Sequence, residues 1–108
     1  MTVTRTGPAR AIGAAPDQAA YRILQEALTN AARHGTGTAR VELGYGQTAL
    51  QITVTNPVQA GLRPAASRGH GVIGMHERAA LLGGQLAAGR AGDTFRVGAR
   101  IPYAGRCA

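Results

Sequence analysis

Apolar and polar residues alternate along several short stretches of the chain, and glycine, proline, asparagine or aspartate bounds most of these stretches. Alternation with a period of two is typical of β-strands that bury one face. The pattern predicts a first strand over residues 1–7, a hairpin over residues 38–56 and a closing hairpin over residues 85–102. Turns at Gly46 and Gly92 separate the two strands of each predicted hairpin.

A longer period, about 3.6 residues, runs between the first strand and the first hairpin. The apolar positions that repeat with this period are Ala20, Ile23, Leu24, Ala27, Leu28 and Ala31. Pro16 and Asp17 suit a first helical turn, because proline tolerates that position and a carboxylate favours the positive end of the helix dipole. The pattern predicts a helix over residues 16–34 and a second, shorter helix over residues 74–83.

The order of the predicted elements is strand, helix, hairpin, loop, helix, hairpin. Antiparallel hairpins with helices between them favour an α+β fold, a two-layer α/β sandwich, over a doubly wound parallel sheet. With 108 residues, the chain is expected to form one domain over residues 1–108. Residues 57–70 are rich in proline, glycine, alanine and serine and predict a loop of a length that is usually functional or disordered.

The net charge of +7 comes from twelve basic residues, all of them arginine. Arginine suits phosphate and carboxylate groups, but these residues are scattered, and neither a recognition motif nor a stacking aromatic pair indicates a nucleic-acid partner. Cys107 is the only cysteine, so no internal disulfide is expected. No apolar stretch approaches the roughly 20 residues of a membrane span, and the N-terminus lacks the apolar region of a signal peptide. We therefore expect no membrane contact by this chain.

Three polar residues of the first predicted helix share one face, because Glu26, Asn30 and His34 are each four positions apart. A carboxylate and an amide oxygen one turn apart are suitable ligands for Mg²⁺ or for its water molecules. The carboxylate of Glu26 is also a candidate general base. The alternative is a solvated polar face with no chemical role.

The sequence RGHGVIG contains Gly69-x-Gly71-x-x-Gly74, which is the spacing of a dinucleotide-binding fingerprint. That fingerprint requires a strand directly before the glycines and an acidic residue about 20 positions later, on the next strand. Here PAASR, which is no strand, precedes the glycines, and LAAGR at the later place has no carboxylate. The helix that follows nevertheless presents free N–H groups to an anion, and the glycines allow close approach of the backbone. The segment therefore predicts an anion site with an undefined ligand.

Two of these motifs, in this order, resemble those of a known family. YRILQEALTNAARHG is similar to the N-box of two-component sensor histidine kinases, and RGHGVIGMHERAALLGGQL is similar to their second glycine box. TFRVGARIP resembles the closing strand, so the resemblance covers nearly the whole chain and is strongest to the subfamily paired with helix-turn-helix response regulators. It implies the Bergerat-type ATPase fold, also called GHKL and shared with DNA gyrase, in which helices cover one face of a mixed, mainly antiparallel sheet.

The resemblance implies ATP and Mg²⁺ as cofactors and assigns roles by position. It implies that Asn30 holds Mg²⁺, that Glu26 is the catalytic base or a second Mg²⁺ ligand, and that Arg33 and His34 approach the phosphates. The residues that it places along the nucleotide in the glycine box are Gly69, His70, Gly71, Val72, Gly74 and Met75. It also implies that residues 57–70 form the ATP lid.

One motif departs from the family. The family's first glycine box reads Asp-x-Gly-x-Gly, and its aspartate accepts a hydrogen bond from the adenine amino group. This chain has Asn56-Pro57-Val58-Gln59-Ala60 at that place. Asn56 keeps an oxygen that can accept the bond, but a neutral group binds less strongly than a carboxylate. The resemblance therefore implies an adenine contact by Asn56 that is weaker than usual.

As a whole, the resemblance implies the ATP-binding catalytic domain of a sensor histidine kinase, in the cytoplasm or at the cytoplasmic end of a membrane-bound sensor. Such a domain donates the γ-phosphoryl group to a histidine on a separate dimerisation domain, from which a response regulator takes it. All three histidines of this chain lie within the ATPase-like region, so we expect the acceptor to lie outside it. Two alternatives stay open: an anti-sigma-factor-type serine kinase, and a degenerate domain that binds nucleotide weakly and acts by docking.

Overall fold

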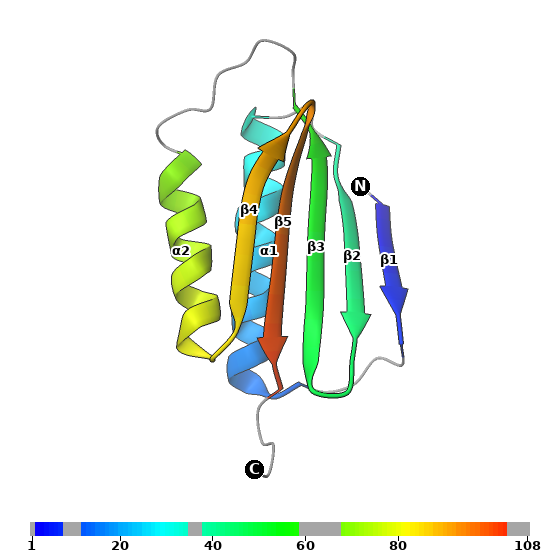
Figure 1. The fold of residues 1–108 in the computed structure, drawn as a ribbon, viewed down its shortest axis with the longest axis vertical. Coiled ribbons are helices and arrows are strands. Elements are labelled where there is room, and N and C mark those ends of the chain that lie inside the picture. Colours follow the sequence, from blue (N-terminus) through cyan, green and yellow to red (C-terminus); the bar gives the residue numbers. More distant parts are fainter. Residues whose placement is uncertain (1, 8–11, 35–37, 59–67, 104–108) are drawn as a thin grey trace.

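The structure, a computed structural model, describes residues 2–7, 12–34, 38–58 and 68–103. The strands within these ranges are β1 (Thr2–Thr6), β2 (Arg40–Tyr45), β3 (Ala49–Pro57), β4 (Gln85–Ala91) and β5 (Thr94–Pro102). These five strands form one mixed sheet in the spatial order β1-β2-β3-β5-β4 (Figure 1). β1 runs parallel to β2, and the other neighbouring pairs are antiparallel.

Two described helices, α1 (Ala14–His34) and α2 (Arg68–Leu81), lie on the same face of the sheet (Figure 1). α1 packs against β3 and β5, while α2 packs against β4 and against α1. The two helices are antiparallel, so the C-terminal end of α1 and the N-terminal end of α2 lie at the same end of the molecule. No helix among the described residues is long and apolar enough to cross a membrane.

The core lies between the helices and the sheet. It forms because buried apolar and exposed polar residues alternate along the strands. Every second residue of β3 points toward the helices, so Ile52 and Val54 are buried while Gln51 is exposed. On the helix side, Ile23 and Met75 have no exposed surface. Burial of such a side chain stabilises the fold by about 1.5–3 kcal/mol, so these contacts hold the helices on the sheet.

The α+β class, the two-layer arrangement and both hairpins are confirmed. The expected start of the second helix near Gly74 is wrong, because α2 begins at Arg68 and ends at Leu81. Three glycines lie inside the observed helix, because the preference of glycine against helix is weak and packing overrides it. The predicted lid over residues 57–70 falls partly outside the described residues, and its last three residues belong to α2.

The junction between α2 and β4 depends on two glycines. Gly83 has a φ of 73°, a left-handed conformation that suits glycine at a helix end. The next residue, Gly84, donates its N–H to the carbonyl of Ala79 at 2.8 Å and so closes the last turn of α2. A Cβ atom on Gly84 would collide with the carbonyl oxygen of Arg100 in β5. The chain therefore needs a residue without a side chain where α2 meets the sheet.

Gly84→Ala should lower the free energy of unfolding by about 1–3 kcal/mol, because the new methyl group has no room against the Arg100 carbonyl. Urea unfolding followed by circular dichroism measures this change. Gly89→Ala in β4 is the matched control, since nothing lies within 4 Å of a Cβ built there. Equal midpoints for the two variants would contradict the packing argument.

Candidate functional site

Asn30 is a polar residue that α1 buries near its C-terminal end. It lies beside the last residues of the apolar stripe of the helix, and its side chain is only 7% exposed. Its Nδ2 atom has no hydrogen-bond partner among the described residues, although buried polar groups are normally paired. Leaving such a group unpaired costs about 1–3 kcal/mol. The orphaned amide is therefore suited to a ligand or a bound water at this place.

Glu26 lies one turn before Asn30 on α1 and is half-buried. Its carboxylate and the amide oxygen of Asn30 belong to residues on neighbouring turns of the helix. Mg²⁺ commonly takes one or two protein oxygens and completes its shell with water and substrate phosphates, and these residues fit that need. Arg33 is exposed in the last turn of the helix, and the side chain of His34 lies outside the described residues.

Asn56 is a second buried polar residue, 4% exposed, near the C-terminal end of β3. It continues the inward alternation of Ile52 and Val54, so its side chain lies on the face that the helices cover. Its Nδ2 donates to the carbonyl of Pro57 at 3.1 Å. This contact uses one of the two amide hydrogens, and the oxygen of Asn56 takes no part in it, so that oxygen can accept a hydrogen bond from a ligand.

Phe95 lies directly opposite Asn56 on β5 and is 7% exposed. Strand alternation predicts Phe95 only as an ordinary core residue, and no signal in the sequence links it to the site. Only the register of β3 with β5 brings the aromatic ring next to the buried amide. An aromatic ring beside a hydrogen-bonding group is suited to a flat, partly apolar ligand.

The glycine box lies in the first turns of α2, with Gly69, Gly71 and Gly74 all inside the helix. The free N–H groups of the helix start therefore belong to the glycine box itself, and not to the turn after Gly74. The side chains of residues 68–72, which include His70 and Val72, lie outside the described residues. Met75 is fully buried in the core, so the described contacts of its side chain are with the core.

These elements meet at one end of the molecule. Figure 1 shows the C-terminal end of α1, the C-terminal end of β3 and the N-terminal end of α2 at the same end of the two layers. Asn30, Asn56 and the glycine box therefore gather there, although the chain separates them widely. The positive end of the α2 dipole and the orphaned amide of Asn30 together make this end suitable for an anionic ligand.

Known proteins resemble this chain in part of its sequence and in its fold. No protein-family model matches the chain. The sensor histidine kinase YxjM of Bacillus subtilis (strain 168) is 40% identical over 67 residues, which are 61% of this chain and 16% of that protein. The chain thus spans about a sixth of the length of this curated relative.

Solved structures match over most of the chain. The histidine kinase domain of the Erythrobacter litoralis EL346 blue-light activated histidine kinase aligns with a TM-score of 0.65 and 18% identity, over 94% of this chain and 54% of that one. The catalytic domain of histidine kinase ThkA aligns with a TM-score of 0.63 and 14% identity, over 94% and 77%. The fold is that of histidine kinase catalytic domains. Acinetobacter baumannii histidine kinase AdeS aligns as well, with a TM-score of 0.60 and 12% identity, over 82% and 47%.

The two buried asparagines of this histidine kinase fold should respond oppositely to an apolar replacement. Asn30→Leu should raise the free energy of unfolding without ligand, by up to about 1–3 kcal/mol, because it removes an unpaired buried amide. Asn56→Leu should lower it by about 0.5–1.5 kcal/mol, because it removes the hydrogen bond to Pro57. Urea unfolding of both variants measures the difference. Destabilisation by Asn30→Leu would mean that the amide is satisfied in solution.

Proposed function

We propose that this chain is the ATP-binding catalytic domain of a sensor histidine kinase. The observation that carries the proposal is the buried amide of Asn30, which has no hydrogen-bond partner among the described residues and lies at the same end of the fold as the glycine-box start of α2. The likeness to histidine kinase catalytic domains and the sequence similarity to a sensor histidine kinase support it. In this proposal the domain binds Mg·ATP and donates the γ-phosphoryl group.

Each candidate residue has a role in the proposed site. Asn30 and Glu26 hold Mg²⁺, which neutralises charge on the phosphates, and Glu26 can also orient or deprotonate an attacking group. Arg33 and His34 lie in the last turn of α1, where cations can pair with phosphate oxygens. Backbone N–H groups at the start of α2 bind phosphate oxygens. Asn56 accepts a hydrogen bond from the adenine amino group. Catalysis then consists mainly of positioning and charge stabilisation.

The partners of the proposed kinase are a domain that carries the phosphoacceptor histidine and a response regulator. The curated relative is far longer than this chain, which agrees with a catalytic domain that works together with other domains. The proposal places these partners and this domain in the cytoplasm.

A second candidate is a degenerate domain that binds nucleotide weakly and signals by docking. The observation that favours it is the sequence Asn56-Pro57 at the adenine contact. Proline offers no N–H donor, and the side chain of Asn56 is a neutral acceptor that binds less strongly than a carboxylate. The affinity for ATP distinguishes this candidate from an active kinase domain.

Asn30→Ala should abolish the Mg²⁺ dependence of ATP binding, because it removes the amide ligand. Titration calorimetry with ATP, in Mg²⁺ and in EDTA, measures this dependence for the wild type and the variant. Thr29→Ala, at the neighbouring position of α1, is the control and should keep the Mg²⁺ effect. Absence of ATP binding by the wild type, even at millimolar ligand, would favour the docking domain over the kinase.

Asn56→Asp should tighten ATP binding by up to roughly tenfold, because a charged acceptor forms a hydrogen bond about twice as strong as a neutral one. Calorimetry with ATP and GTP measures both the affinity and the selectivity for adenine. Gln51→Glu adds the same charge on the exposed face of β3 and should change neither. An equal gain with Gln51→Glu, or no gain with Asn56→Asp, would remove Asn56 from the adenine contact.

A further inference from the structure

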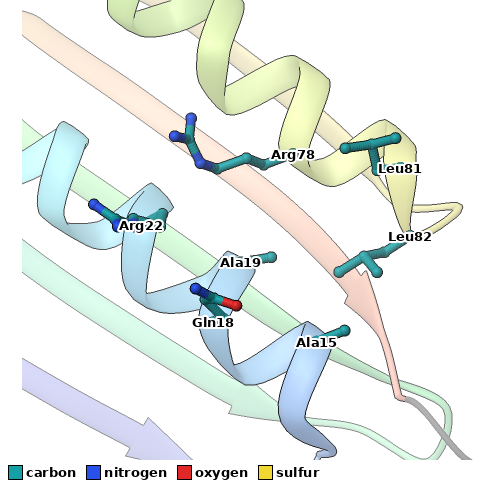
Figure 2. Close-up of a pocket in the computed structure, with 7 residues that line it drawn as sticks. All are labelled: Ala15, Gln18, Ala19, Arg22, Arg78, Leu81 and Leu82. Carbon is teal, nitrogen blue, oxygen red and sulfur yellow. The ribbon is translucent and has the colours of Figure 1, made fainter.

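A groove of about 440 Å³ lies between the N-terminal half of α1 and the C-terminal half of α2. The residues that line it are Ala15, Gln18, Ala19, Arg22, Arg78, Leu81 and Leu82 (Figure 2). Since the helices are antiparallel, this groove lies at the far end of the helix pair from Asn30 and the glycine box. It is therefore separate from the proposed nucleotide site.

The two ends of the groove differ in chemistry. Figure 2 shows Arg22 and Arg78 at one end, and Leu81, Leu82 and Ala15 at the other. Leu81 is 85% exposed, which is a large apolar surface for a helix residue to present to water. Ala19, between the ends, has a small side chain, so the space between the helices stays open there. An apolar end and a cationic end suit an occupant that carries both kinds of group.

The cationic end is not neutralised by the groove itself. Nη1 of Arg22 donates to Oε1 of Gln25 at 3.5 Å, and Nη1 of Arg78 donates to the carbonyl of Gly74 at 3.2 Å. Both acceptors are neutral, so these contacts hold the guanidinium groups without cancelling their charge. None of the described residues that line the groove is acidic. Two arginines on facing helices therefore present uncompensated charge to carboxylates of an occupant.

We propose that this groove docks an acidic, amphipathic segment of a partner protein. An apolar side chain of the segment packs against Leu81, Leu82 and Ala15, and its carboxylates pair with Arg22 and Arg78. A helix rises about 1.5 Å per residue, so the positions of Ala15 and Arg22 on α1 lie roughly 10 Å apart. A helical segment with a leucine and a glutamate about two turns apart on one face can therefore contact both ends of the groove, the leucine at the apolar end and the glutamate at the cationic end.

Fluorescence anisotropy with the full chain tests this inference. The probes are labelled helical peptides that carry leucine and glutamates on one face, in a set that varies their spacing around two turns. The same peptides with glutamine in place of glutamate are the matched probes. We expect saturable binding of at least one acidic peptide, and the R22Q/R78Q double variant should weaken it by roughly tenfold or more. Leu81→Ala should also weaken it, by roughly threefold or more.

Matched variants separate docking from general attraction to a chain of net charge +7. Arg40→Gln with Arg96→Gln removes the same charge from the exposed face of the sheet and should weaken binding by less than about twofold. Ile73→Ala removes an exposed apolar side chain from α2 outside the groove and should leave binding unchanged. Equal losses from the two arginine pairs would overturn the inference. Equal affinity for the glutamine peptides, or no saturable binding below about 1 mM, would overturn it as well.

Docking of an acidic segment in the groove does not depend on the proposed kinase function, and one variant separates the two. Asn30→Ala should lose the Mg²⁺ effect on ATP binding while keeping its affinity for the acidic peptide. ATP binding, measured directly by titration calorimetry, that R22Q/R78Q weakens as much as it weakens peptide binding would assign the groove to a nucleotide and overturn the inference.

Discussion

The packing of α1 against β3 and β5 is the contact on which the rest of the structure depends. Ile23 on the helix and Ile52 and Ile101 on the strands have no exposed surface, and together they close the space between the two layers. α2 then packs against α1 and against the edge strand β4. If this contact were lost, neither the site end of the molecule nor the groove between the helices would keep its shape.

The same packing buries polar side chains, and their burial lowers the stability of the fold. α1 buries Asn30 beside the last residues of its apolar stripe, and β3 buries Asn56 just beyond Val54. Each asparagine thus occupies a position where the local pattern calls for an apolar residue. Such local inconsistency is expected at functional sites, because stability is lost there in exchange for a ligand contact. Asn56 offsets part of this cost through Pro57, whereas Asn30 has no described partner for its amide hydrogens.

The helix pair therefore has two chemically different ends. One end carries the start of α2 and the buried asparagines, which suit a phosphate-bearing ligand. The other end carries a groove with two arginines and exposed leucine surface, which suits an acidic peptide. Because α1 and α2 pack against each other, both ends belong to one helix pair.

Much of the fold and part of the site follow from local patterns. Period-two alternation placed both hairpins, because each strand buries one face, and the 3.6-residue period placed α1 with Glu26 and Asn30 on one face. Other features depend on contacts between residues distant in the chain: the parallel pairing of β1 with β2, the position of β5 between β3 and β4, the pairing of Phe95 with Asn56 and the start of α2 at Arg68. The groove also depends on contacts between distant parts of the chain, since Arg22 and Arg78 belong to different helices. The period of the sequence indicates which side of a helix or strand is buried. Only the packing of helices and strands against one another decides which residues that side contacts.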